Sequence, residues 1–259
     1  MKYLVSIILA MIAAIFPLIS SLLPSSPPDS EVESEFYDDE LLNICSQAKD
    51  KDFVLFYNPG GMGSKPMGED TQWKGVVEGI ESALGEMGYT CLIVEHIRTD
   101  ATWLGYMKEI KDCVSLFSVK SRELAAKVKF LVENVKDIKV IITGASMGAV
   151  FCSEVMGLLK ADLRAYSIEA GMPFWHRDST SARTLSINDN GVTPDALSSG
   201  SIRAIARSCF LAPFRWLGSR LRGEHVTLSG CANVPGHEYY WDYPGVQSQI
   251  RAFLEENFG

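Results

Sequence analysis

The stretch Lys139-Val-Ile-Ile-Thr-Gly-Ala-Ser-Met-Gly-Ala149 combines a short strand, a very tight turn and the start of an apolar helix. Val140 to Thr143 are β-branched, which is typical of a buried strand, and a helical apolar pattern follows from Ala149. The turn between them has the form G-x-S-x-G. Glycines on both sides of Ser146 provide the space that a sharp strand-to-helix turn needs, and such a turn lifts the hydroxyl clear of the sheet. We therefore predict that Ser146 is a nucleophile, and that the N–H of Met147 at the helix start can donate to an oxyanion.

Apolar strands alternate with amphipathic helices on both sides of this stretch, which predicts an α/β domain with a mostly parallel central sheet. The uninterrupted apolar character of the first strand suits a sheet covered by helices on both faces. The predicted strands are 53–57, 89–95, 140–143, 163–168, 184–187 and 225–229. The predicted helices are 40–48, 71–87, one or two within 107–136, one from 149, and 246–257. Residues 41–259 are long enough to form a single domain of this class.

The strand-G-A-S-M-G-helix pattern, with a glycine-rich turn upstream and an Asp and then a His downstream, resembles the α/β-hydrolase superfamily of serine hydrolases. The resemblance covers roughly Phe53 to Phe258. It implies the α/β-hydrolase fold, with a possible small helical cap. It also implies cleavage of a carboxylic ester, which could be a lipid ester or a thioester, through an acyl-enzyme. Such chemistry needs no cofactor, and no cysteine has the spacing of a metal site.

The resemblance also implies a base and an acid. The pair Gly236-His237 lies between the last predicted strand and the last helix, where the catalytic histidine of the superfamily lies. Asp189 follows the strand 184–187 and matches the acid loop, so it is the first choice for orienting the histidine. Asp195 is the second choice and Glu169 is a minor one. Ser146, Asp189 and His237 then follow the chain order of this superfamily.

The glycine-rich turn Asn58-Pro-Gly-Gly-Met-Gly63 is where a serine hydrolase would have its second oxyanion donor, here the N–H of Gly61 or Met62. A phosphate-binding loop is disfavoured, because Pro66 stands where such a loop has its magnesium-binding Ser or Thr. A plain turn remains an alternative. Phe174 and Trp175 could line an acyl pocket or form an ordinary edge of the core.

The segment from Ser201 to Arg222 mixes arginines with large apolar residues. This composition suits a cap over the active site or a helix on a lipid surface, and an ordinary surface helix is the simpler alternative.

The amino-terminal segments predict export. Tyr3 to Leu23 is an uncharged apolar run after Lys2, so residues 1–23 are a signal peptide or a signal-anchor transmembrane helix. The anchor is favoured by the length of the run, with the domain on the non-cytoplasmic side. Residues 24–40 form an extended linker rich in proline, serine and acids. Its seven acids account for most of the net charge of −8, so the remaining domain is near neutral and nucleic acid is not expected as a partner.

Six cysteines in an exported chain permit disulfides, although Cys91 and Cys152 are expected to be packed thiols. The expected partners are a small-molecule or lipid ester and, through the amino-terminal segment, a membrane. An acyltransferase on the same fold and a non-catalytic, membrane-anchored envelope module are the alternatives.

Overall fold

The computed structural model describes residues 32–159, 164–176, 181–223 and 234–259. It divides into two compact units, Met1–Leu42 and Asn43–Gly259, and helix α2 (Val32–Ala48) runs across the boundary between them. The predicted strand 225–229, the apolar segment 1–23 and the first part of the linker lie outside the described residues. Within the described ranges, no helix is long and apolar enough to cross a membrane.

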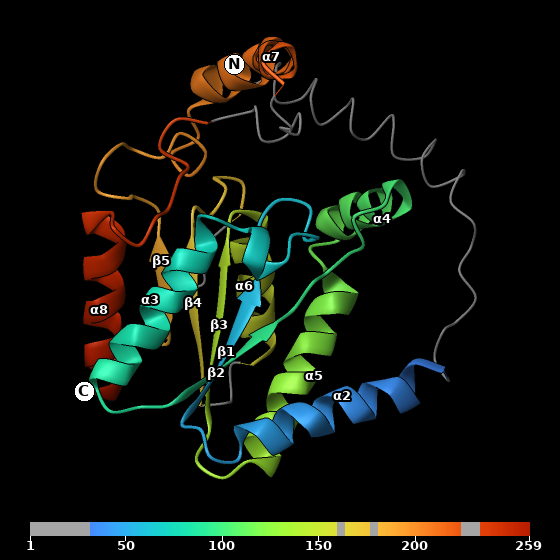
Figure 1. The fold of residues 1–259 in the computed structure, drawn as a ribbon, viewed down its shortest axis with the longest axis vertical. Coiled ribbons are helices and arrows are strands. Elements are labelled where there is room, and N and C mark those ends of the chain that lie inside the picture. The colour runs from blue at the N-terminus through green and yellow to red at the C-terminus, as the bar shows by residue number, and fades with distance from the viewer. Residues whose placement is uncertain (1–31, 160–163, 177–180, 224–233) are drawn as a thin grey trace. The chain divides into compact units, whose positions relative to one another are not determined.

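The second unit is built on a five-stranded sheet in the order β2-β1-β3-β4-β5 (Figure 1), in which every neighbouring pair of strands is parallel. The strands are β1 (Phe53–Asn58), β2 (Cys91–Glu95), β3 (Lys139–Ala145), β4 (Ala165–Ala170) and β5 (Thr184–Ile187). The predicted α/β class with a parallel sheet is therefore confirmed.

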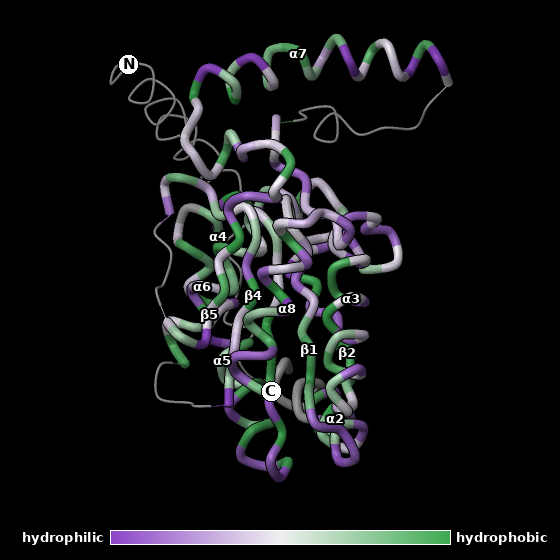
Figure 2. The backbone as a smooth tube through the Cα atoms, turned by 90° about the vertical axis from the view of Figure 1, so that its left-hand side faces the viewer, coloured by the Kyte–Doolittle hydropathy of each residue, from purple (hydrophilic) through white to green (hydrophobic). Residues whose placement is uncertain are grey.

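Helices cover both faces of the sheet. One face carries α3 (Trp73–Glu86) and α8 (Pro244–Phe258), and the other carries α5 (Ser118–Asn134) and α6 (Met147–Leu158). The remaining helical elements are η1 (Met67–Glu69), α4 (Trp103–Val114) and α7 (Ile202–Leu221). Alternate residues of β1 serve the two faces, since Phe53, Leu55 and Tyr57 belong to the core under α3 and α8. The hydropathy colouring shows β1 as an apolar strand (Figure 2), as expected for a strand buried on both sides.

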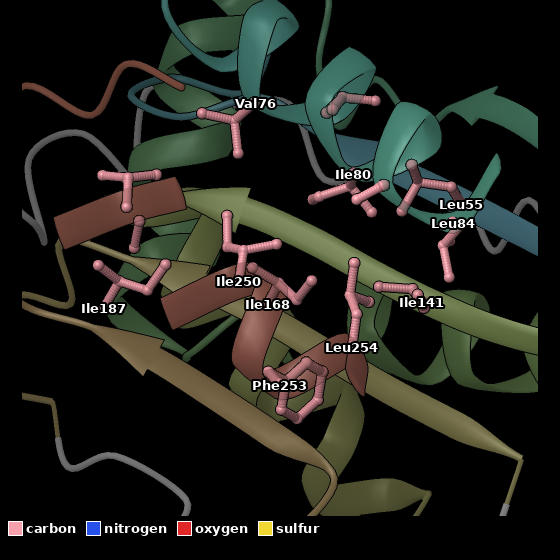
Figure 3. Close-up of a cluster of buried hydrophobic side chains, with 14 of the residues drawn as sticks. Leu55, Val76, Ile80, Leu84, Ile141, Ile168, Ile187, Ile250, Phe253 and Leu254 are labelled. Carbon is pink, nitrogen blue, oxygen red and sulfur yellow. The ribbon is translucent and has the colours of Figure 1, made fainter. Parts of the chain in front are cut away.

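The core between the sheet and the helices α3 and α8 combines aliphatic and aromatic side chains, part of which Figure 3 shows. Val76, Ile80 and Leu84 of α3 recur at helical spacing and meet Ile250 and Leu254 of α8. Burying a side chain of this size contributes about 1.5–3 kcal/mol each. This core fixes the strands of the sheet to the helices α3 and α8.

One segment differs from the sequence-based expectation. The extended linker was predicted to reach Glu40, but α2 already begins at Val32. Glutamates have a good helix propensity, so the acids of this segment are compatible with a helix as well as with an extended chain.

The order of the strands decides where a site can form. The first strand of the sheet is β1; β2 lies on one side of it, and β3 lies on the other side. Ligands of parallel α/β sheets bind at such a switch point, beyond the carboxyl ends of the strands. The loop after β1 and the turn after β3 are therefore neighbours, and the register pairs Asn58 with Gly144.

Candidate functional site

The turn after β3 holds Ser146 in a strained conformation, with φ 55° and ψ −119°. A non-glycine residue in this region costs about 1–3 kcal/mol, and such strain concentrates at functional positions. The N–H of Ser146 donates to the carbonyl of Ala170 at the end of β4, at 2.8 Å. Helix α6 begins at the next residue, Met147, so its N–H lies at a helix amino terminus as predicted.

The two glycines of the turn are required by close contacts. A Cβ on Gly144 would lie 2.6 Å from the carbonyl carbon of Gly148. A Cβ on Gly148 would lie 2.8 Å from the carbonyl oxygen of Asn58 and 2.9 Å from that of Pro59. The start of α6 therefore rests directly on the loop that follows β1.

Gly148→Ala is expected to lower the free energy of unfolding by about 1–3 kcal/mol, because both atoms that its Cβ would meet belong to the backbone. Gly157→Ala in the same helix is the matched control. A Cβ on Gly157 meets nothing within 4 Å, so this variant should be neutral or more stable by up to about 1 kcal/mol. Urea denaturation of both variants measures the difference, and equal stabilities would contradict the contact.

His237 pairs with Asp195. The His237 Nδ1 lies 2.8 Å from the Asp195 Oδ2, and the Tyr239 hydroxyl donates to the same oxygen at 2.7 Å. The other carboxylate oxygen accepts from the N–H of Leu197 at 2.7 Å. Asp195 is 1% exposed, so this carboxylate is enclosed by its donors.

These donors keep Asp195 ionised. Burial alone would raise its pKa, but the hydrogen bond and charge of His237, together with the hydrogen bonds from Tyr239 and Leu197, lower the pKa to about 2. A lowered pKa stabilises the fold above the ordinary pKa of the carboxyl group, and this contribution is lost as the pH falls towards 2. Asp195 is therefore an anion throughout the neutral range.

The structure pairs His237 with the second candidate acid and not with the first. Asp189 does not meet His237. Its Oδ1 accepts from the N–H of Gly191 at 2.8 Å, and its backbone forms a bridge with Pro194. Aspartate readily caps its own turn in this way. The turn that Asp189 closes instead leads the chain to Asp195, the second candidate.

The third candidate acid, Glu169, lies on the other face of the sheet. Side chains alternate along β4, and Ile168 and Ala170 belong to the core under α3 and α8. Glu169 is therefore directed towards the α5 and α6 side, where it is fully buried and accepts a hydrogen bond from Ser167. It is not part of the His237 pair.

Asn190 holds the loop that carries the histidine, a role that the sequence did not reveal. Its side-chain amide donates to the carbonyls of Gly236 at 3.1 Å and Glu238 at 2.8 Å, the two neighbours of His237. Its Oδ1 accepts from the N–H groups of Val192 and Thr193. Asparagine is common in turns, and the two carbonyls that accept from its amide lie more than 40 residues away, so no local pattern distinguishes it.

His237 and Ser146 meet the same backbone segment. A Cβ on Gly171 would lie 2.8 Å from His237 Cε1, so the imidazole packs against this glycine. The preceding residue, Ala170, accepts the hydrogen bond from the Ser146 N–H. The structure thus brings Ser146, His237 and Asp195 to the carboxyl edge of the sheet.

The glycine-rich loop lies against Ser146. A Cβ on Gly60 would lie 2.9 Å from the Ala145 carbonyl oxygen and 3.9 Å from Ser146 Cβ. Gly61 has a positive φ of 56°, and a hydrogen bond of 3.1 Å from the Gly63 N–H to the Gly60 carbonyl closes the turn around Gly61 and Met62. The two predicted sources of oxyanion donors are therefore adjacent.

Arg98 braces this loop and was not found from the sequence. Its Nη1 donates to the Pro59 carbonyl at 2.7 Å, and its backbone N–H donates to the Gly63 carbonyl at 2.9 Å. Its Nε donates to Glu109 at 3.0 Å, and Glu109 also accepts from Lys120 at 2.8 Å. The side chains of Arg98 and Glu109 are fully buried. Arg98 thus holds one end of the candidate oxyanion loop with its buried, ion-paired side chain and the other end with its backbone N–H.

Phe174 and Trp175 lie on the surface after β4. They are 43% and 58% exposed, and their rings meet edge to face with centroids 5.2 Å apart. A Cβ on Gly200 would lie 3.2 Å from the Phe174 ring, so this aromatic covers the loop that follows Asp195. Both side chains are too exposed to belong to the core, and an acyl pocket lined by them stays a prediction.

The remaining described histidines and two of the cysteines lie in ordinary structural surroundings. His96 stacks on Phe151 at 5.5 Å, and burial lowers its pKa to about 3, so it is neutral. His176 lies 3.7 Å from Glu154. Cys91 and Cys152 are free thiols, as predicted. The described part of the chain contains no group of three or more His, Cys, Asp or Glu side chains that could hold a metal ion.

Comparison with known proteins gives one kind of match. No family model matches the chain, and no curated protein matches it. Among solved structures, it is similar to a Trichoderma reesei cutinase in complex with a C11Y4 phosphonate inhibitor. The identity is 13%, the match covers 95% of this chain and 99% of the cutinase chain, and the TM-score is 0.46.

Proposed function

We propose that this chain is a serine hydrolase that cleaves carboxylic esters through an acyl-enzyme. Ser146 is the nucleophile, His237 is the general base, and Asp195 holds the histidine in the required tautomer. One observation carries this proposal: the strained Ser146 lies at the same carboxyl edge of the sheet as the hydrogen-bonded pair of His237 and the buried Asp195. A serine is a weak nucleophile unless an oriented base accepts its proton, and this arrangement offers one.

The proposed reaction uses these side chains as follows. With Nδ1–H donating to Asp195, the Nε2 of His237 is the unprotonated nitrogen that takes the Ser146 proton. The hydroxyl oxygen attacks the ester carbonyl, and the resulting oxyanion accepts hydrogen bonds from the Met147 N–H and from Gly61 or Met62. The tetrahedral intermediate then collapses, the C–O bond to the alcohol breaks, and His237 gives its proton to the leaving alcohol. A water molecule, deprotonated by His237, attacks the acyl-enzyme; the bond from the acyl carbon to Ser146 breaks, His237 returns the proton to Ser146, and the acid is released.

A fluorophosphonate probe tests the proposal directly. The folded full chain is labelled, digested and mapped by mass spectrometry, with heat-denatured chain as the control. We expect an adduct on Ser146 that is lost in His237→Ala, because the hydroxyl needs the histidine for activation. Absence of an adduct on the folded chain would overturn the proposal and favour the non-catalytic module.

Arg98→Lys is expected to lower kcat for ester hydrolysis about 10- to 100-fold with little change in KM. Lysine keeps the charge but cannot reproduce the fork that joins Glu109 and the Pro59 carbonyl, so the oxyanion loop is displaced. Lys120→Met is the matched control, since it removes the other partner of Glu109 without touching the loop. Steady-state kinetics and denaturation are measured for both variants. Equal losses of kcat at equal losses of stability would assign Arg98 a purely structural role.

A further inference from the structure

Helix α7 exposes its large apolar residues and buries small ones. Its large apolar residues Phe210, Phe214, Leu217 and Leu221 are 71%, 63%, 53% and 82% exposed. Their spacing places them within about 60° of one another around the helix. They form a single stripe, which we call the α7 stripe.

The buried side of α7 consists of small residues. Ser208, Ala212 and Ser219 are 4%, 4% and 8% exposed, and their positions lie roughly opposite the stripe. A helix that serves the core of a soluble domain buries its large apolar face. The orientation of α7 therefore leaves its hydrophobic face available to a partner.

Charge indicates which partner. Helix α7 carries four arginines and no acidic residue, and Arg222 follows it, while the whole chain has a net charge of −8. Arg203 and Arg207 continue the line of the stripe towards the helix start, and both are exposed. The tube coloured by hydropathy shows this alternation of polar and apolar residues along α7 (Figure 2). On α7, arginines flank exposed phenylalanines and leucines, although the chain as a whole is acidic. Such a surface is suited to anionic lipid.

We propose that the α7 stripe docks the protein on an anionic lipid surface. Phe210, Phe214, Leu217 and Leu221 enter the boundary between headgroups and acyl chains, and the flanking arginines contact lipid phosphates. This binding does not depend on ester hydrolysis, so it can be measured in Ser146→Ala, in which the lipid would not be consumed.

Cys209 supplies a local probe. It is an exposed thiol within α7, so an environment-sensitive dye on this residue reports on the helix itself and not on the amino-terminal segment. The full chain is labelled and titrated with vesicles of phosphatidylcholine alone or mixed with phosphatidylserine, and labelled Cys209→Ser gives the background. We expect a blue shift of the emission with the anionic vesicles and a much weaker one with phosphatidylcholine.

Variants separate the apolar and the charge contributions. Phe210→Ser with Phe214→Ser should weaken vesicle binding at least about tenfold. Arg203→Gln with Arg207→Gln should weaken it about tenfold at low salt and less at high salt. The control is Val119→Ser with Leu158→Ser, which removes exposed apolar side chains from α5 and α6 and should leave binding unchanged.

Three results would overturn the docking proposal. If the double substitution of Phe210 and Phe214 left vesicle binding unchanged, the α7 stripe would not take part in the interaction. If neutral and anionic vesicles bound equally well, the arginines would not contribute to it. A blue-shifted emission without vesicles would mean that protein covers the stripe, by a second copy if the shift depends on concentration and by the same chain if it does not.

Discussion

Ser146→Ala is expected to reduce ester hydrolysis about 10⁴- to 10⁶-fold, because the acyl-enzyme cannot form without the hydroxyl. The measurement is the turnover of a chromogenic short-chain ester, with burst kinetics as a second readout of the acyl intermediate. The fold should survive the change, since alanine keeps the Cβ, adds no atom and places no new demand on the φ of 55°. Activity within tenfold of the original would contradict Ser146 as the nucleophile.

Ser146→Gly is the informative control for that variant. Glycine adopts a positive φ without strain, so this variant should be as inactive as Ser146→Ala while being more stable by about 1 kcal/mol or more. A stable, inactive Ser146→Gly would show that the backbone strain at the turn is tolerated for the sake of the hydroxyl. If Ser146→Gly were less stable than the original chain, the strain argument would be wrong.

Asp195→Asn is expected to lower kcat on the order of 10³- to 10⁴-fold, because the amide can donate to His237 Nδ1 and so favour the wrong tautomer. Asp189→Asn is the matched control, lying six positions earlier in the same turn. An asparagine can keep the hydrogen bond to the Gly191 N–H, so this variant should retain nearly full activity. The comparison needs kcat for both variants over a range of pH.

The opposite ranking of these two variants would restore Asp189 as the acid. Comparable losses in both would point to a disturbed turn rather than to either carboxylate. Tyr239→Phe helps to distinguish a role of Asp195 from a disturbed turn, since it removes one donor to Asp195 without changing the turn at Asp189. It should reduce kcat much less than Asp195→Asn does, because the His237 contact with Asp195 remains.

The elements with a strong local pattern were predicted well from the sequence. The strand at 184–187 agrees residue for residue with β5, and the closing helix and the strand before Ser146 are displaced by only one or two residues at their ends. Short apolar runs between turn residues are enough for such predictions. The start of α2 was missed because acidic residues fit a helix and a solvated chain equally well.

Residues whose role depends on distant partners could not be predicted in the same way. From the sequence, Arg98 is indistinguishable from a surface arginine. In the structure it is buried against Glu109 and the Pro59 carbonyl. Asn190 reads as a turn residue until its amide meets the loop around His237. Neither contact leaves a periodic or spacing signal in the chain.

The sequence by itself determined the strand, the tight turn and the helix around Ser146, because glycines beside a β-branched run and an apolar helix constrain the backbone locally. It also favoured an acid from the turn after residue 187, with Asp189 ranked before Asp195 and Glu169 kept as a minor candidate. Only the tertiary structure shows that Asp195, and not Asp189, contacts His237. The first aspartate closes its own turn and the bridge to Pro194, and this closure carries the second one to within 2.8 Å of the His237 ring.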